Sequence, residues 1–345
     1  MQHPVRLRVA YRRLTAAAGL AVIAAIAASL AGAAGPPVNG KIAFSRYDEN
    51  FMPQIWVANP DFSNARKIGP DGGGLYIDWS PDAKRLVFDS DRLAPGTDHI
   101  DVFSMKPDGS DVALLTGDLP GFNGEPAYSP DGTWIAFEHD DFADATRSGI
   151  WRMRVDGTDK RQVTSFPGPG YDLTPRFSPD GKRIAFSRHR EGKPDRHGRP
   201  GKTTGAVHVV NVDGRDLQRI TSWKLVTDDV DWSPNGRWIV FATHPTYQGS
   251  NPTDVYIVHP DGDGLRNLTR NPRLGQDGSP SYAGSSHPSW SPDGSKILYL
   301  QEWIDADGNG GNDFWTMTAD GDAKAVVLQT ADVEDEASWG TAPAS

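Results

Sequence analysis

The amino-acid sequence predicts an all-β fold, a six-bladed β-propeller, from three observations. A ten-residue pattern, complete at 290–299 as Trp-Ser-Pro-Asp-Gly-Ser-Lys-Ile-Leu-Tyr, recurs with small changes along the chain. Two further strand patterns follow each copy, so that four strands come about every 50 residues. One more copy is divided between the two ends of the chain. Five close matches do not arise by chance, so one supersecondary unit has been repeated.

The repeated pattern describes a β-hairpin. Each copy opens with an aromatic strand end, followed by Ser-Pro-Asp-Gly or a close variant; these aromatic residues are Trp79, Tyr128, Phe177, Trp232 and Trp290. Proline presets φ, aspartate can bond its own backbone, and glycine accepts a positive φ, which together favour a tight turn. Alternating apolar residues such as Ile184 and Phe186 then begin the next strand.

A third and a fourth strand are predicted after each hairpin. The third-strand patterns are Ile55-Trp56-Val57, Val102–Met105, Ile150–Met153, Val207-His208-Val209, Val255-Tyr256-Ile257 and Phe314–Met317. A turn such as Asp156-Gly157 and a fourth apolar stretch such as Leu114-Leu115 complete the unit. Four antiparallel strands at this spacing are typical of a propeller blade. Although 345 residues suggest two domains by length, repeat arrays often form one, and we expect a single domain at 35–345.

The divided copy predicts how the ring closes. Residues 39–45 carry the second half of the repeat, and residues 336–340 carry the first half. We therefore expect strand 1 of the last blade at about 334–339 and its strands 2 to 4 at about 40–68. Pairing the chain ends in this way removes an exposed sheet edge, which gives Trp339 a structural role.

These motifs resemble the WD40-like PD40 repeat of the TolB-type β-propellers, over about residues 36–340. The resemblance implies the propeller fold. It is weak for function, because one fold hosts many functions. TolB proteins also carry an N-terminal α/β domain, and no part of this sequence resembles that domain.

Residues 1–34 are expected to be a secretory signal. Four arginines precede an uninterrupted small and apolar run at 14–34, which contains Ala31-Gly32-Ala33, an A-x-A cleavage pattern. The alternative is a retained membrane anchor, because about 20 apolar residues can span a bilayer. The chain contains no Cys, so disulfides and a lipid-modified cysteine are excluded. We expect a secreted or periplasmic protein without further membrane contact, and a monomer.

The net charge and the loop lengths limit the partners. A formal charge of −10 argues against nucleic acid and anionic membranes. The turns between strands 1 and 2 and between strands 3 and 4 are short and uniform, so one face of the disc is plain. The loops between strands 2 and 3 differ widely in length, and 270–286 is the longest blade-to-blade connection. Because variable loops on a rigid scaffold carry binding groups, this second face is the expected binding face.

The innermost strands start on that face and should line a central channel. One residue stands three positions before each anchoring aromatic, and these residues are Tyr76, Glu125, Thr174, Asp229, His287 and Glu336. If they converge, the mouth of the channel is acidic and would attract a cation or a basic peptide segment. The alternative is a set of solvated acids without a specific role.

Two loops suggest further sites. The segment 305–313 offers Asp305, Asp307, Asn309 and Asp313 as side-chain ligands and the carbonyl of Gly311, an oxygen-rich set that suits Ca²⁺. It resembles the calcium loops of integrin-type propellers. However, Asp101 and Asp254 stand at the position equivalent to Asp313 in other repeats, so this aspartate is also a feature of the repeat. A weak structural calcium site is one interpretation, and an ordinary hairpin is the other. The loop 188–205 carries six basic residues, expected to form either a basic patch for an acidic partner or a solvated loop.

The sequence favours a non-catalytic binding module for a protein, peptide or glycan of the cell envelope. Catalytic thiol chemistry needs a Cys, and neither a Gly-x-Ser-x-Gly elbow nor a His-Glu-x-x-His motif occurs. The alternative is a glycan-active lyase or hydrolase that uses channel-mouth acids such as Glu125, Asp229 and Glu336. Oligogalacturonate lyases, which are similar propellers with a metal held by His, keep that alternative open.

Overall fold

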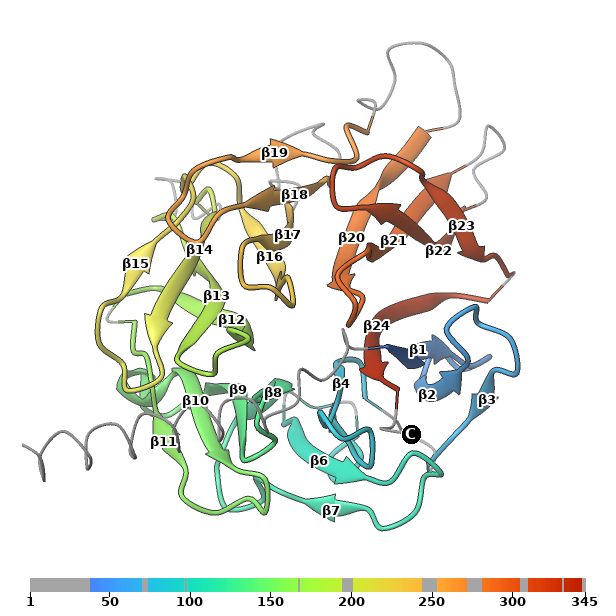
Figure 1. The fold of residues 1–345 in the computed structure, drawn as a ribbon. Helices are drawn as coiled ribbons and strands as arrows, with labels where there is room; N and C mark the ends of the chain where they lie inside the picture. Colours follow the sequence, from blue (N-terminus) through green and yellow to red (C-terminus); the bar gives the residue numbers. More distant parts are fainter. Residues whose placement is uncertain are drawn as a thin grey trace, which may run out of the picture. The chain divides into compact units, whose positions relative to one another are not determined.

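The computed structural model describes residues 38–69, 74–95, 97, 99–166, 168–193, 201–243, 253–271, 281–304, 310–330 and 332–342. The expected secretory segment at 1–34 lies outside this part of the chain. Residues from Val38 onward form one compact unit. Its strands make six four-stranded antiparallel sheets arranged around a common centre (Figure 1). The predicted six-bladed propeller is therefore confirmed.

Each blade contributes its first strand to the centre of the ring (Figure 1). These innermost strands are β4 (Ile77–Trp79), β8 (Phe122–Tyr128), β12 (Gly170–Phe177), β16 (Thr227–Trp232), β20 (Ser281–Trp290) and β24 (Glu334–Thr341). The second strands are β1 (Asn39–Tyr47), β5 (Leu86–Ser90), β9 (Trp134–Asp140), β13 (Arg183–Arg190), β17 (Ile239–Thr243) and β21 (Lys296–Ile304).

The third and fourth strands lie progressively further out. The third strands are β2 (Pro53–Ala58), β6 (Asp101–Met105), β10 (Gly149–Arg154), β14 (Thr204–Asn211), β18 (Val255–Val258) and β22 (Gly310–Thr318). The fourth strands are β3 (Arg66–Lys67), β7 (Ala113–Leu114), β11 (Arg161–Gln162), β15 (Gln218–Arg219), β19 (Arg266–Asn267) and β23 (Ala325–Leu328). The one helical element among the described residues is a short 3₁₀ turn, η1 (Ala145–Arg147).

One blade combines both ends of the chain. Its strand order is β24-β1-β2-β3, and Ile42 of β1 lies opposite Trp339 of β24. Both the pairing and the strand bounds agree with the closure expected from the divided repeat.

The Ser-Pro-Asp-Gly turns fold as their residues dictate. In the turn after Tyr128, Ser129 Oγ donates to Asp131 Oδ1 at 2.6 Å and accepts from the N–H of Trp134 at 2.9 Å. Gly132 has φ +67°, in the left-handed region that glycine adopts without steric cost. Each turn thus fixes the register of its hairpin and keeps one face of the disc plain.

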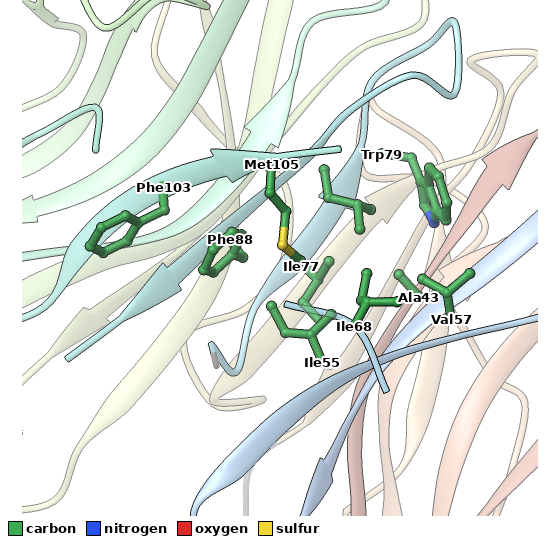
Figure 2. Close-up of a cluster of buried hydrophobic side chains, with 10 residues drawn as sticks. Ala43, Ile55, Val57, Ile68, Ile77, Trp79, Phe88, Phe103 and Met105 are labelled. Atoms are coloured by element: carbon green, nitrogen blue, oxygen red, sulfur yellow. The ribbon is translucent and has the colours of Figure 1, made fainter. Parts of the chain in front are cut away.

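The hydrophobic core consists of clusters between adjacent blades. Figure 2 shows one of them, in which Ile55, Val57 and Ile68 of the closing blade pack against Trp79 and Met105 of the next. The apolar residue at the end of the repeat is buried in all six blades, as Phe44, Phe88, Phe137, Phe186, Phe241 and Tyr299. Because apolar burial is the main stabilising term, these blade-to-blade contacts hold the propeller together.

Candidate functional site

The candidate site is built on β-bulges in the innermost strands. The pairing with the second strand shifts register between Gly124 and Ala127, Leu173 and Arg176, Asp228 and Asp231, and Ser286 and Ser289. Inside these bulges four residues have a positive φ, namely Glu125 (53°), Thr174 (51°), Asp229 (47°) and His287 (48°). Positive φ is uncommon for residues other than glycine, and bulges re-aim side chains next to functional sites. The repeat therefore supplies a strained position at the same place in four blades.

Carboxylates of neighbouring blades satisfy the N–H groups that the bulges free. Asp89 Oδ2 accepts from the N–H of Glu125 at 3.0 Å. The Glu125 carboxylate accepts in turn from the N–H of Thr174, and Asp229 Oδ2 accepts from the N–H of His287 at 3.3 Å. Because a buried N–H without a partner is costly, these acids also stabilise the blade junctions.

The structure brings the six residues singled out from the sequence together. We call Tyr76, Glu125, Thr174, Asp229, His287 and Glu336 the axial ring. The rings of Tyr76 and His287 have centroids 6.5 Å apart. His287 Nε2 lies 3.8 Å from Asp229 Oδ2 and 3.9 Å from Glu336 Oε2. That the axial ring binds a ligand stays a prediction.

A second polar layer stands one residue before the anchoring aromatics, and the sequence analysis did not single it out. Asp78 Oδ2 accepts from the N–H of Tyr128 at 2.8 Å, and Asp231 Oδ2 accepts from that of Trp290 at 2.7 Å. Arg176 Nη2 lies 3.4 Å from Glu336 Oε1. In the sequence, this layer could have been recognised from the polar residue that precedes the aromatic residue in most copies of the repeat. Arg176 supplies a positive charge to the acidic centre.

Glu125 and Glu336 of the axial ring are buried, which differs from the solvated acids that the sequence left as an alternative. Glu125 is 6% exposed and Glu336 is 7% exposed. Burial, together with the charge of Asp229, raises the pKa of Glu125 to about 7. Burial also raises the pKa of Glu336 to about 8, although His287 and Arg176 oppose the shift. Carboxyl groups in this environment favour the protonated form near neutral pH, and a cation that binds beside them would lower their pKa and ionise them.

The surroundings of His287 favour the charged form of its side chain. Burial by itself lowers its pKa, but the nearby carboxylates of Asp229, Asp335 and Glu336 outweigh burial and raise the pKa to about 10. Asp335 Oδ1 lies 3.5 Å from His287 Nε2. The carboxylates therefore favour the protonated, positively charged form of the imidazole.

Glu125 also forms a pair with a second carboxyl group. Its side chain lies close enough to that of Glu138 in β9 for the two carboxyl groups to shift each other's pKa, and Glu138 is 8% exposed. Burial and the charge of Glu125 raise the pKa of Glu138 well above its usual value. Two carboxyl groups in such contact share a proton, because both cannot ionise at low cost.

The expected calcium loop lies largely outside the described residues, which include Gly311 and Asp313 but not Asp305, Asp307 or Asn309. Asp313 is 3% exposed, and its Oδ2 accepts from Gln329 Nε2 at 3.3 Å. The equivalent position has a structural role in another blade, since Asp101 accepts a hydrogen bond from Thr116 Oγ1 at 2.7 Å. The calcium site stays a prediction.

The expectation of a basic patch at 188–205 needs a correction. Arg188 is 6% exposed, and its Nε lies 2.5 Å from Asp172 Oδ1. Arg190 stacks 3.6 Å from the centre of the Trp223 ring. Arg188 therefore belongs to the fold, because a buried charge needs a partner, whereas Arg190 at the end of β13 is exposed.

The opposite face carries two shallow pockets, of about 420 and 480 Å³. Both are lined by Lys84 and Lys106. These cations lie near carboxylates, Lys84 at 3.3 Å from Asp82 and Lys106 at 3.7 Å from Asp111.

Comparisons with known proteins agree with this architecture. The profile described as PD40, TolB beta propeller domain, matches residues 113–343. A solved structure of TolB from Acinetobacter baumannii has a TM-score of 0.63 at 19% identity and covers 87% of this chain and 66% of its own. An oligogalacturonate lyase structure from Vibrio parahaemolyticus has a TM-score of 0.50 at 14% identity, covering 75% of this chain and 70% of its own. At these identities the two structures show the fold alone.

One curated relative is the uncharacterized peptidase YuxL of Bacillus subtilis. It is 29% identical over 185 residues, which are 52% of this chain and 23% of the relative. The match thus spans about a quarter of that protein. Among the described residues of this chain, no helix has the length and apolar character needed to cross a membrane.

Proposed function

The chain belongs to the PD40 family of TolB β-propeller domains, and we propose that it is a binding module whose axial ring receives a basic segment of a protein or peptide partner. One observation carries the proposal. Asp229 Oδ1 and Glu336 Oε2 are buried and have no hydrogen-bond partner. Buried carboxylate oxygens without a donor are costly. A lysine or arginine side chain that enters the axial ring would supply charged hydrogen-bond donors to these oxygens.

The charge balance of the centre supports a cationic ligand. The side chain of Glu336 is 9% exposed, and that of Arg176 beside it is 16% exposed. A larger set of acids surrounds the cations of the centre: Asp78, Glu125 and Asp231 lie near Arg176, and Asp229 lies near His287. In a partly desolvated setting each charge interaction is stronger than in water. Complementary charge also speeds encounter and selects partners.

The face around the ring offers apolar contacts to a polypeptide. Connections between second and third strands carry three highly exposed apolar side chains in three successive blades: Phe51 at 76%, Leu93 at 59% and Phe142 at 63%. These connections lie on one face because the sheets are antiparallel. Exposed apolar groups beside a polar centre are typical of protein-binding surfaces. This combination favours a peptide or protein over an envelope glycan, which is the weaker candidate.

The proposed setting is the cell envelope, with the chain acting as a monomer outside the cytoplasm. The secretory character of residues 1–34 supports export. The similarity to a TolB structure is compatible with an envelope partner, but it does not identify one.

The test is capture from an envelope extract followed by quantitative binding of the captured partner. We expect the double substitution Glu125→Gln and Glu336→Gln to weaken binding at least tenfold and to reduce its salt dependence, because charged groups at a binding site steer association. Asp108→Asn with Asp156→Asn, in exposed turns on the plain face, is the matched control and should leave binding unchanged. Equal binding and equal salt slopes for all three proteins would exclude the axial ring as the binding site.

A second candidate is a glycan-active lyase or hydrolase, favoured by the pair of Glu125 and Glu138. A carboxyl group with a pKa of about 7 can act as a general acid or base near neutral pH. If this candidate is right, purified protein turns over an acidic or neutral polysaccharide, and Glu138→Gln abolishes turnover. Binding that survives Glu138→Gln without any detectable turnover would leave the binding module as the function.

A further inference from the structure

Three successive blades place a histidine and two carboxylates at one point of the axial ring. Asp229 comes from β16, His287 from β20 and Glu336 from β24. One donor atom of each residue lies within 4.8 Å of the donor atoms of the other two. The arrangement depends on the blade-to-blade geometry and not on any local sequence motif.

The donor atoms are spaced more widely than hydrogen-bonded atoms and somewhat more widely than the ligands of one metal ion. His287 Nε2 is 3.8 Å from Asp229 Oδ2 and 3.9 Å from Glu336 Oε2, and both separations are too long for a hydrogen bond. Ligands at about 2.0 to 2.2 Å from one metal ion are about 3.0 to 3.5 Å apart. Small side-chain rotations would therefore bring all three donors to coordination distance.

Each of the three side chains is held by a further contact. His287 Nδ1 is hydrogen-bonded to Ser286 Oγ at 3.0 Å, which leaves Nε2 for a ligand role. Glu336 Oε1 lies 3.4 Å from Arg176 Nη2, and Asp229 Oδ2 accepts from the N–H of His287 at 3.3 Å. Contacts of this kind orient the ligands of metal sites and raise affinity.

A second, independent observation is the presence of buried oxygens without donors. Glu336 Oε2 and Asp229 Oδ1 have no hydrogen-bond partner. The two side chains are 9% and 10% exposed. A cation bound between the Asp229 and Glu336 carboxylates would supply the missing partner.

We propose that Asp229, His287 and Glu336 form a binding site for one divalent transition-metal ion, Zn²⁺ or Mn²⁺. Imidazole nitrogen combined with carboxylate oxygen suits these ions, whereas Ca²⁺ prefers oxygen ligands alone. Asp335, whose Oδ1 is 3.5 Å from His287 Nε2, is a fourth donor. The metal ion and a basic side chain would use the same two oxygens, Glu336 Oε2 and Asp229 Oδ1, so the site holds only one of them at a time. The measurement of bound metal does not depend on the binding of a partner.

The experiment measures metal bound to the full chain after stripping with a chelator and dialysis against Zn²⁺ or Mn²⁺. We expect one tightly bound ion per chain by elemental analysis, and a Co²⁺ derivative with absorption bands of a site containing nitrogen and oxygen ligands. His287→Gln and Glu336→Gln should each weaken binding more than about tenfold. Asp305→Asn with Asp307→Asn, in the separate candidate calcium loop, is the control and should bind normally.

The test still gives an answer if a variant of the axial ring folds poorly. Far-UV circular dichroism identifies folded variants, and X-ray absorption of the metal-loaded native chain reports the ligands without any substitution. One imidazole nitrogen with carboxylate oxygens supports the site. The proposal is overturned if the native chain retains no metal, if folded His287→Gln or Glu336→Gln binds as tightly as the native chain, or if the loop control abolishes binding.

Discussion

Ile42 and Trp339 lie directly opposite each other in neighbouring antiparallel strands, although they stand near opposite ends of the chain. Trp339 packs against the cluster that contains Ile42, Phe44 and Leu298. The last strand therefore completes a blade begun by the first, and the ring has no open edge at this junction.

Trp339→Ala should destabilise the fold by about 3 kcal/mol, because removing a large, mostly buried aromatic side chain leaves a cavity. Trp339→Phe should cost much less, since a ring still fills the site. Urea unfolding followed by tryptophan fluorescence measures both variants. A loss below about 0.5 kcal/mol for the alanine variant, within the range of surface substitutions, would contradict the closing role.

Arg176→Met should destabilise the protein strongly, by about 3 to 5 kcal/mol, because it leaves buried carboxylates without their counter-ion. The loss should be larger at about pH 8 than at about pH 5, since protonation of the acids relieves the repulsion. Asp231, whose pKa burial raises to about 6, is one of the groups concerned. Arg176→Lys keeps the charge and is the control. Equal losses at both pH values would show that Arg176 acts through packing alone.

Unfolding free energy should fall as pH rises from about 4 to about 7. Burial raises the pKa of Glu125 to about 7 and that of Asp89 to about 6, so the folded state holds protons that the unfolded state has released in this range. The contribution of Glu125 is at most about 3 kcal/mol. Urea titrations of metal-free protein at several pH values measure the slope. Glu125→Gln should flatten it, and an unchanged slope would contradict the assignment.

Thr116→Val should cost about 1 to 3 kcal/mol, because it leaves two buried groups without partners. Thr116 Oγ1 accepts from the N–H of Val102 at 2.9 Å and donates to Asp101 Oδ1 at 2.7 Å. Thr116→Ser keeps the hydroxyl and should lose less than half as much. Thermal unfolding of the three proteins provides the comparison, and similar losses for serine and valine would rule out the hydrogen bonds as the cause.

Calcium at about 10 mM should stabilise the protein by about 1 to 3 kcal/mol if the loop 305–313 binds it with a dissociation constant of about 0.1 to 1 mM. Asp305→Asn with Asp307→Asn should remove this gain, whereas His287→Gln should keep it. Differential scanning calorimetry with and without Ca²⁺ measures the shift. An unchanged unfolding temperature in the native chain would favour the ordinary hairpin.

The blade number, the strand order and the closing blade followed from the sequence, because they depend on local rules. Turn chemistry and alternation of apolar residues act over a few neighbours, and their repetition identifies the unit. Comparison of equivalent positions in the repeats also identified the axial ring, through residues such as Glu125 and Glu336. It did not identify Arg176 or Glu138, since their roles come from residues of other strands and blades.

The sequence by itself determined the propeller, the residues at its centre and the acidic character of that centre. Only the tertiary structure decided that these acids are buried, that bulges turn Asp229 and His287 toward Glu336, and that Arg188 belongs to the interior. The reason is physical: repeat chemistry is local, whereas burial, charge partners and donor spacing arise only when successive blades face one another across the ring.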